Sequence, residues 1–205
     1  MKLAVLISGS GSNLQAFIDC CADKSLPAEI AVVLSNKKQA FGLQRAEQAG
    51  IPTLCIDHRE FKDREEFDTA MVAALSDYEV DLVILAGFMR ILTPIFIEAY
   101  RGRLLNIHPS LLPKYPGLQT HQRALDAGDQ EAGVTVHFVT EELDGGPPIV
   151  QARVPIMAGD DADMLAARVL QQEHIIYPQA AQWFCQGRLT LAGNQVLLDG
   201  APVEL

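Results

Sequence analysis

The chain has 205 residues, 49% of them hydrophobic, which is enough for one substantial core and short for two full domains. We therefore expect a single domain over residues 1–205. The 26 acidic residues outnumber the 16 basic ones, and the formal net charge of -10 disfavours nucleic acid and anionic membranes as partners. An anionic small substrate stays possible, because a few donors at the start of a helix act at short range.

The cysteines and the first residues indicate the compartment. Cys20, Cys21, Cys55 and Cys185 contain no C-x-x-C motif, so neither a disulfide framework nor a zinc site is suggested. The apolar run at the start breaks into Gly and Ser after Ile7, which is too short for a signal peptide or a membrane span. We expect a cytoplasmic protein.

Short apolar runs alternate with amphipathic segments in the first half of the chain. The runs predict buried strands at residues 3–7, 30–34, 53–56, 82–85 and 104–107. The amphipathic segments predict helices at residues 13–21, 40–49, 64–75 and 93–99. Such alternation favours an α/β fold with a mostly parallel sheet that is covered on both faces.

The pattern changes after residue 107. A loop with Pro and Gly leads to a predicted helix at 120–127, an alternating strand at 134–139 and another strand at 149–154. Acidic residues from Asp160 onward signal a long helix that we expect to end at about residue 176, before Pro178. Residues 189–198, with Gly193-Asn194 between apolar runs, predict an antiparallel hairpin.

A glycine-rich turn, ISGSGSN at 7–13, follows the first strand and opens the first helix. Free backbone N–H groups and the helix dipole attract an anion at such a position. Leu14 stands where a dinucleotide motif needs its third glycine, and no acidic ribose ligand follows, so NAD is disfavoured. A single phosphate fits better, and a plain turn with Ser or Asn as the N-cap is the alternative.

The stretch LLNIHPSLLPKYPG at 104–117 places an amide and an imidazole at the end of a strand. Asn106 and His108 are two residues apart, so they point to the same side, at the edge where α/β sheets bind ligands. Asp144 lies on a Gly-containing loop after a later strand, and a carboxylate beside His108 would favour the protonated ring. Such a trio suits direct acyl transfer, with Asn106 stabilising an oxyanion and His108 moving a proton.

The other histidines carry less information. His137 shares a strand face and is interpreted as a residue behind the site, whereas His58, His121 and His174 fit solvated or helix-surface positions. No two histidines are spaced as metal ligands, and there is no G-x-S-x-G nucleophile motif. We therefore predict a site without a metal.

The quoted motifs, together with LAGFMRIL at 85–92, GVTVHFVTEELDGGPPI at 133–149 and QEHIIYP at 172–178, resemble the folate-dependent formyltransferases. Within them, the chain is similar to the glycinamide ribonucleotide transformylase branch of purine biosynthesis. The resemblance implies a Rossmann-like, doubly wound sheet with an antiparallel C-terminal extension. It also implies that residues 1–107 bind the ribonucleotide phosphate and that residues 108–205 carry the folate-site and C-terminal half.

The resemblance implies the following site residues. Asn106, His108 and Asp144 match the catalytic trio. The substrate would be bound by Gly11, Ser12, Asn13 and Glu173. The co-substrate 10-formyltetrahydrofolate would be bound by Arg64, Met89, Arg90, Ile91, Leu92, Thr140, Glu141, Glu142, Leu143 and Asp144. Leu170 departs from relatives that carry a polar residue there, so no ligand role is assigned to its side chain.

Three other functions share parts of this pattern. A formyltetrahydrofolate deformylase would use the same trio to send water to the formyl carbon, but such enzymes resemble this core with an added N-terminal domain. A methionyl-tRNA formyltransferase would need a further C-terminal domain and a basic face. A non-catalytic phosphate or folate binder would not need the trio. We expect small-molecule substrates, and a monomer or homodimer.

Overall fold

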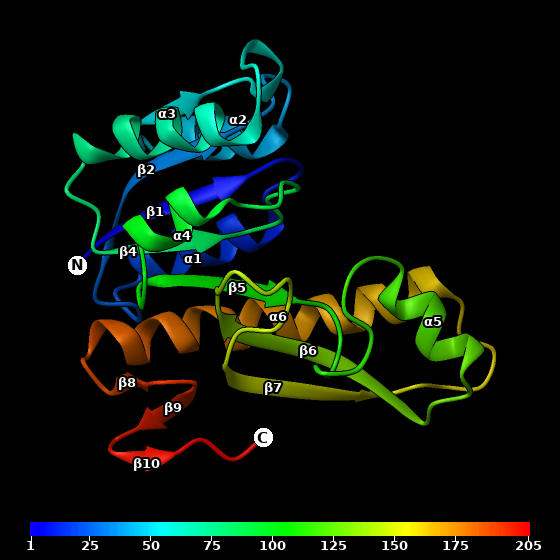
Figure 1. The fold of residues 1–205 in the computed structure, drawn as a ribbon. Coiled ribbons are helices and arrows are strands. Elements are labelled where there is room, and N and C mark those ends of the chain that lie inside the picture. Colours follow the sequence, from blue (N-terminus) through cyan, green and yellow to red (C-terminus); the bar gives the residue numbers. More distant parts are fainter. The chain divides into compact units, whose positions relative to one another are not determined.

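The computed structural model describes residues 1–205, and the chain divides into two compact units, Met1–Asn106 and Ile107–Leu205 (Figure 1). The first unit alternates strands and helices, as expected. Its strands are β1 (Lys2–Ile7), β2 (Glu29–Ser35), β3 (Thr53–Cys55), β4 (Leu82–Leu85) and β5 (Leu104–His108), the last of which crosses the unit boundary. Its helices are α1 (Ser12–Ala22), α2 (Phe41–Gln48), α3 (Arg64–Ser76), α4 (Pro94–Ala99) and the short 3₁₀ turn η1 (His58–Glu60).

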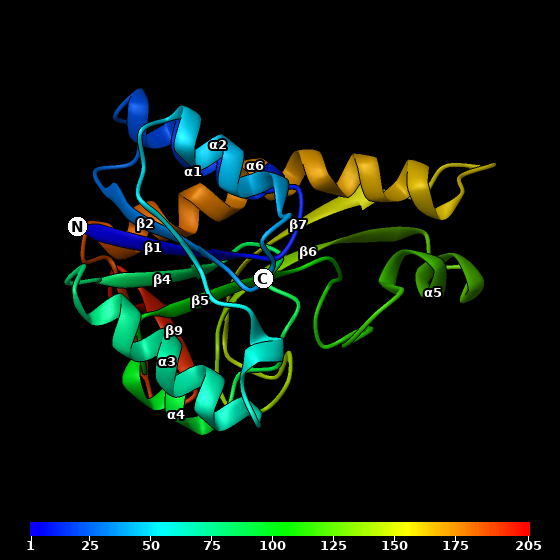
Figure 2. The ribbon, with the colours of Figure 1, turned by 90° about the horizontal axis from the view of Figure 1, so that it is seen from above.

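The strands of the first unit pair in parallel, in the order β3-β2-β1-β4-β5. Figure 2 shows α1 and α2 on one face of these strands and α3 and α4 on the other. The central strand β1 is buried on both faces, with Leu3 to Ile7 fully inaccessible. Its continuous apolar sequence follows from this double cover, because a strand between two helical layers has no solvent-facing side.

The second unit contains α5 (Thr120–Asp126), β6 (Glu131–Phe138), β7 (Pro148–Pro155) and the long helix α6 (Ala162–Cys185). Strands β6 and β7 are antiparallel, and α6 packs against both. The chain ends in β8 (Leu189–Ala192), β9 (Gln195–Leu198) and β10 (Ala201–Pro202). The predicted hairpin at 189–198 is confirmed, and β10 adds a third antiparallel strand that the sequence did not predict.

The predicted end of the long helix is wrong. We expected it to end near residue 176 because Pro178 cannot donate a helical hydrogen bond, but α6 continues to Cys185. Tyr177, Ala180 and Ala181 are fully buried around the proline. A proline inside a helix costs about 3 kcal/mol. We attribute the continuation of α6 through Pro178 to this buried face. Burial of one large side chain contributes about 1.5–3 kcal/mol, which is similar to the cost of the proline.

β1 to β7 form one sheet in the order β3-β2-β1-β4-β5-β6-β7, and β8 to β10 form a separate one. The predicted fold class is therefore confirmed: a mostly parallel, doubly wound sheet with an antiparallel C-terminal extension. None of the helices combines the length and the apolar character that a membrane span requires. The organisation as a single domain stays a prediction.

Candidate active site

The glycine-rich turn of the first unit runs from β1 into α1. Gly11 is the N-cap of α1, in the left-handed region at φ 71°, and no side chain caps the helix. The alternative of a Ser or Asn cap is therefore wrong. Because no capping side chain competes for them, the first backbone N–H groups of α1 suit a bound anion.

Helix α2 fixes the shape of this turn. The Gly42 N–H donates to the Gly9 carbonyl at 3.1 Å, and Arg45 Nε donates to the Ser10 carbonyl at 2.8 Å. A Cβ atom on Gly11 would lie 2.7 Å from the Gly42 Cα, closer than real Cβ contacts. Gly11 is thus required by its backbone angle and by the close approach of α2. Ser12 and Asn13 occupy the first two positions of α1, and Asn13 is buried.

The predicted folate residues of the first unit lie on α3 and after β4. Arg64 is the first residue of α3, where Asp63 caps the helix by accepting from the Glu66 N–H at 2.9 Å. Met89 and Ile91 are 61% and 55% exposed, so they are not ordinary core residues, whereas Leu92 is buried. The Arg90 guanidinium lies 5.8 Å from the centre of the Phe67 ring on α3.

In the second unit, His108 is surrounded by hydrogen-bond acceptors. Its Nε2 lies 2.8 Å from the Tyr115 carbonyl oxygen, and its Nδ1 lies 3.5 Å from Asp144 Oδ1. Both side chains are buried. The other carboxylate oxygen, Asp144 Oδ2, accepts from the Gly117 N–H at 2.8 Å. The predicted pairing of His108 with Asp144 is therefore present.

Two hydrogen-bond acceptors face the two nitrogens of the His108 ring. A carbonyl oxygen only accepts, so Nε2 carries a proton, and Nδ1 faces a carboxylate that also accepts. Asn106 and His108 are alternate residues of β5, so their side chains share one side of that strand. An amide can stabilise negative charge on oxygen, and an imidazole can move a proton.

Both residues that contact the His108 ring have unusual backbone angles. Tyr115 and Asp144 are both non-glycine residues with positive φ, at 54° and 52°. The Tyr115 hydroxyl donates to Asp129 at 2.8 Å, and Lys114 forms an ion pair with the same carboxylate at 3.0 Å. These bonds hold the loop around Tyr115 in a conformation that an aromatic residue rarely adopts.

The loop from Thr140 to Asp144 follows β6, and its residues Glu141 to Leu143 are exposed. Two glycines, Gly145 and Gly146, follow Asp144. Gly146 leaves no room for a side chain, because its Cβ would lie 1.8 Å from the Phe138 carbonyl oxygen of β6. Gly146 therefore allows the backbone after Asp144 to pack directly against the backbone at the end of β6. His137 is buried, and its Nδ1 donates to the same Phe138 carbonyl at 2.9 Å.

Burial lowers the pKa of His137, which favours a neutral ring. The structure also reveals a histidine that sequence reasoning missed. His121, expected on a helix surface, has a buried Nδ1 without a partner. Burial lowers the pKa of His121, and the charge of His108 lowers it further, so His121 lies within electrostatic reach of His108. No local sequence pattern signals this, because His121 comes 13 positions after His108, beyond an irregular loop and the start of α5.

Glu173 and Leu170 both lie on α6, in the second unit. The predicted residues thus divide between the units. The first unit holds Gly11, Ser12, Asn13, Arg64, Met89, Arg90, Ile91, Leu92 and Asn106. The second unit holds His108, Thr140, Glu141, Glu142, Leu143, Asp144 and Glu173. No group of three or more His, Cys, Asp or Glu side chains is suited to a metal ion.

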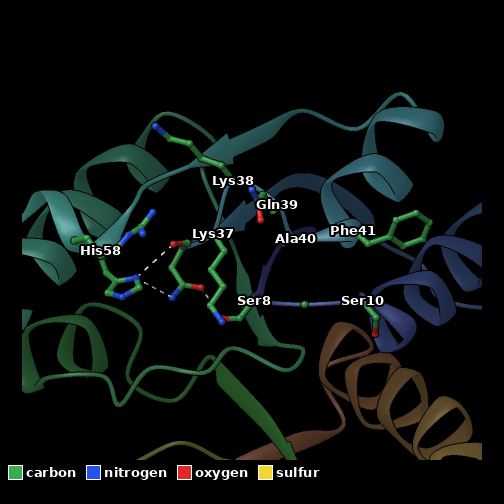
Figure 3. A pocket seen from close by; sticks show the side chains of 11 residues that line it. Ser8, Ser10, Lys37, Lys38, Gln39, Ala40, Phe41 and His58 are labelled. Carbon is green, nitrogen blue, oxygen red and sulfur yellow. Dashed lines mark hydrogen bonds between the residues drawn. The ribbon is translucent and has the colours of Figure 1, made fainter.

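A cleft of about 770 Å³ lies at the carboxyl ends of β1, β2 and β3 (Figure 3). Ser8, Lys37, Phe41 and His58 are among its lining residues. None of the predicted site residues lines it. Ser8, Gly9 and Ser10 of the glycine-rich turn do line it, so the cleft adjoins the predicted phosphate-binding residues.

Known proteins are similar to this chain in sequence and in fold. The family model described as "Formyl transferase" matches residues 1–181. Phosphoribosylglycinamide formyltransferase of Escherichia coli is 56% identical over 98% of this chain and 94% of its own length. The same-named protein of Coxiella burnetii, solved in complex with CHES, is 51% identical with a TM-score of 0.95, covering 100% of this chain and 96% of that one.

A further solved structure, glycinamide ribonucleotide transformylase 1 from Symbiobacterium toebii, is 46% identical with a TM-score of 0.95. The likeness covers 97% of this chain and 93% of that one. Since the family model covers most of the chain and these relatives match it almost end to end, the chain belongs to the formyl transferase family.

Proposed function

We propose that the chain transfers the formyl group of 10-formyltetrahydrofolate to the amine of glycinamide ribonucleotide, in purine biosynthesis. The observation that carries the proposal is the buried pair of His108 and Asp144, in which both ring nitrogens face acceptors. The names of the chain's relatives support glycinamide ribonucleotide as the substrate. The start of α1 at Gly11, which no side chain caps, supports a substrate that carries a phosphate.

The amine nitrogen of the substrate attacks the formyl carbon, and the carbonyl electron pair moves to oxygen. Asn106 and the protonated His108 stabilise that oxyanion, while Asp144 stabilises the imidazolium. When the tetrahedral intermediate collapses, the bond between the formyl carbon and N10 of the folate breaks. The protonated His108 donates a proton to N10, and the neutral ring then takes up the proton that the attacking amine loses, which restores the starting state.

The remaining predicted residues bind the two substrates. We assign the phosphate to Gly11, Ser12 and Asn13, and the ribose hydroxyls to Glu173. Exposed Met89 and Ile91 suit the flat ring system of a folate, since an apolar surface that faces solvent needs a partner of that kind. Arg64, Arg90, Leu92 and the loop from Thr140 to Asp144 complete the folate-binding set.

A cytoplasmic location fits the four free cysteines, because a reducing compartment keeps thiols unpaired. The two small molecules are the proposed partners. The choice between monomer and homodimer stays a prediction.

The test uses 10-formyltetrahydrofolate labelled in its formyl carbon, with and without glycinamide ribonucleotide. We expect labelled formylglycinamide ribonucleotide and free tetrahydrofolate only when both substrates are present. Labelled formate in the absence of the ribonucleotide would instead identify a deformylase. Binding of both molecules by calorimetry without labelled product would identify a non-catalytic binder.

A further inference from the structure

Four buried polar side chains hold the two ends of the segment at residues 89–93, which includes the proposed folate residues Met89 to Leu92. These side chains belong to Ser8, Asn36, Asp68 and Thr93, and each is at most 5% exposed. All four lie in the first unit. Buried polar groups of this kind need hydrogen-bond partners, so the partners they have are structurally informative.

Ser8 fixes the first end of the segment. The Met89 N–H donates to Ser8 Oγ at 2.8 Å, and the Ser8 hydroxyl donates to Asn36 Oδ1 at 2.6 Å. Asn36 therefore orients the hydroxyl so that its lone pairs face the Met89 N–H. Ser8 also immediately precedes the glycine-rich turn, so this single hydroxyl joins the segment to the end of β1.

Asp68 fixes the second end from α3. Its Oδ2 accepts from the Thr93 N–H at 2.6 Å and from the Thr93 hydroxyl at 2.7 Å. Thr93 is the N-cap of α4 and is followed by Pro94, so the chain after it has a fixed helical direction. The two bonds thus tie the end of the segment to the second turn of α3.

The charges of two proposed folate residues act on the same carboxylate. Burial raises the pKa of Asp68, while the hydrogen bonds from Thr93 and the charges of Arg90 and Arg64 act in the opposite direction. Arg90 also lies over the Phe67 ring, one residue before Asp68. The face of α3 that carries Arg64, Phe67 and Asp68 is therefore the surface on which the segment rests.

We propose that Ser8 and Asp68 are positioning residues that hold the folate-binding segment in place through the Met89 amide and through Thr93. The inference rests on the proposed function, because it names residues that act on the folate through others. The exposed Met89 and Ile91 side chains cannot be fixed by core packing. A backbone that is held at both ends loses less conformational freedom when a ligand binds, and this raises affinity.

The first experiment compares Ser8→Ala with Ser35→Ala in the full chain. Ser35 is a matched control: it is fully buried, lies at the end of β2, and its hydroxyl donates to the Lys37 carbonyl at 2.9 Å. We expect Ser8→Ala to raise the dissociation constant of tetrahydrofolate about fivefold to tenfold, the effect of one lost hydrogen bond. The KM for 10-formyltetrahydrofolate should rise similarly, with kcat at saturation within about twofold of the unmodified chain. Ser35→Ala should change neither.

The second experiment compares the tetrahydrofolate affinity of Asp68→Asn and Thr93→Val, which change the hydrogen bonds that Asp68 accepts. Asp68→Asn keeps an acceptor for Thr93, and we expect its tetrahydrofolate affinity to stay within about twofold. Thr93→Val removes one of the two bonds and should weaken binding about threefold. A large loss in Asp68→Asn, or none in Thr93→Val, would overturn the role assigned to Asp68.

Amide hydrogen exchange provides a readout that does not depend on activity. In Ser8→Ala, the Met89 amide should lose protection while amides of β1 and β4 keep theirs, which also shows that the variant is folded. Unchanged Met89 protection together with unchanged tetrahydrofolate affinity would overturn the role of Ser8. If the unmodified chain neither bound tetrahydrofolate nor transferred formyl, the proposed function would fail, and the exchange result would still decide whether Ser8 holds the segment.

Discussion

Replacing Gly146 by alanine tests how the turn between β6 and β7 positions Asp144. The added Cβ would lie 1.8 Å from the Phe138 carbonyl oxygen and 2.9 Å from its carbonyl carbon, whereas real Cβ atoms essentially never approach within 3.0 Å. The neighbouring backbone cannot yield freely. The Phe138 N–H donates to the Pro147 carbonyl at 3.0 Å, and the Phe138 carbonyl accepts from His137.

The size of the effect follows from the displacement. Relieving the contact needs a backbone movement of more than about 1 Å, and overpacking of this kind costs about 3 kcal/mol. For a chain of this length, that corresponds to a fall in melting temperature of roughly 6–12 °C. The displacement begins two residues from Asp144, which lies 3.5 Å from His108. A misplacement of about 1 Å in a catalytic group lowers kcat about 100-fold.

The neighbouring Gly145→Ala is a matched control. The three atoms nearest to its Cβ all belong to the flexible side chain of Glu142, which can move away. Thermal unfolding followed by circular dichroism, together with kcat from the formyl transfer assay, separates the two variants. Equal melting temperatures for Gly146→Ala and Gly145→Ala would refute the reasoning.

Three further predictions concern other parts of the chain. His108→Ala should lower kcat by roughly two to four decades with little change in ribonucleotide affinity, measured by transfer kinetics and calorimetry; an equal loss of both would contradict a proton-transfer role. The Arg168 guanidinium lowers the pKa of Asp160 to about 2, so the stability from this pair is present above the ordinary carboxyl pKa of 3.8 and is lost as the pH falls through about 2. Urea unfolding between pH 4 and 2 should therefore depend less on pH in Asp160→Asn, and identical slopes would count against the pairing. Gly11→Ala should reduce both stability and phosphate affinity, because φ 71° and the Gly42 backbone at 2.7 Å disfavour a side chain; denaturation and calorimetry of inorganic phosphate measure this, and an unperturbed variant would show that the turn can relax.

Much of the fold could be predicted from local pattern. The apolar run of β1 reflects burial on both faces, and the amphipathic spacing of α3 reflects burial on one face. In a fold with a covered parallel sheet, this difference distinguishes the strands from the helices. The spacing of Asn106 and His108 likewise determined that they share one side of a strand. The pairing of His108 with Asp144 could be expected from residue type and from the resemblance to a family, although their distance could not.

Other features depended on contacts between distant segments. Helix α6 passes Pro178 because a buried face around Tyr177 supports it, and a rule based on proline alone cannot count that burial. The Tyr115 carbonyl became a partner of His108 through a backbone angle that is rare for an aromatic residue.

Sequence by itself determined the order and kind of the elements, the strand that carries Asn106 and His108, and the family. Tertiary structure alone decided which groups meet: Ser8 with Met89, 81 positions later, and Asp68 with Thr93. The physical reason is range. Periodicity and turn chemistry act over a few neighbouring residues, whereas a hydrogen bond between remote positions depends on how packing places whole elements.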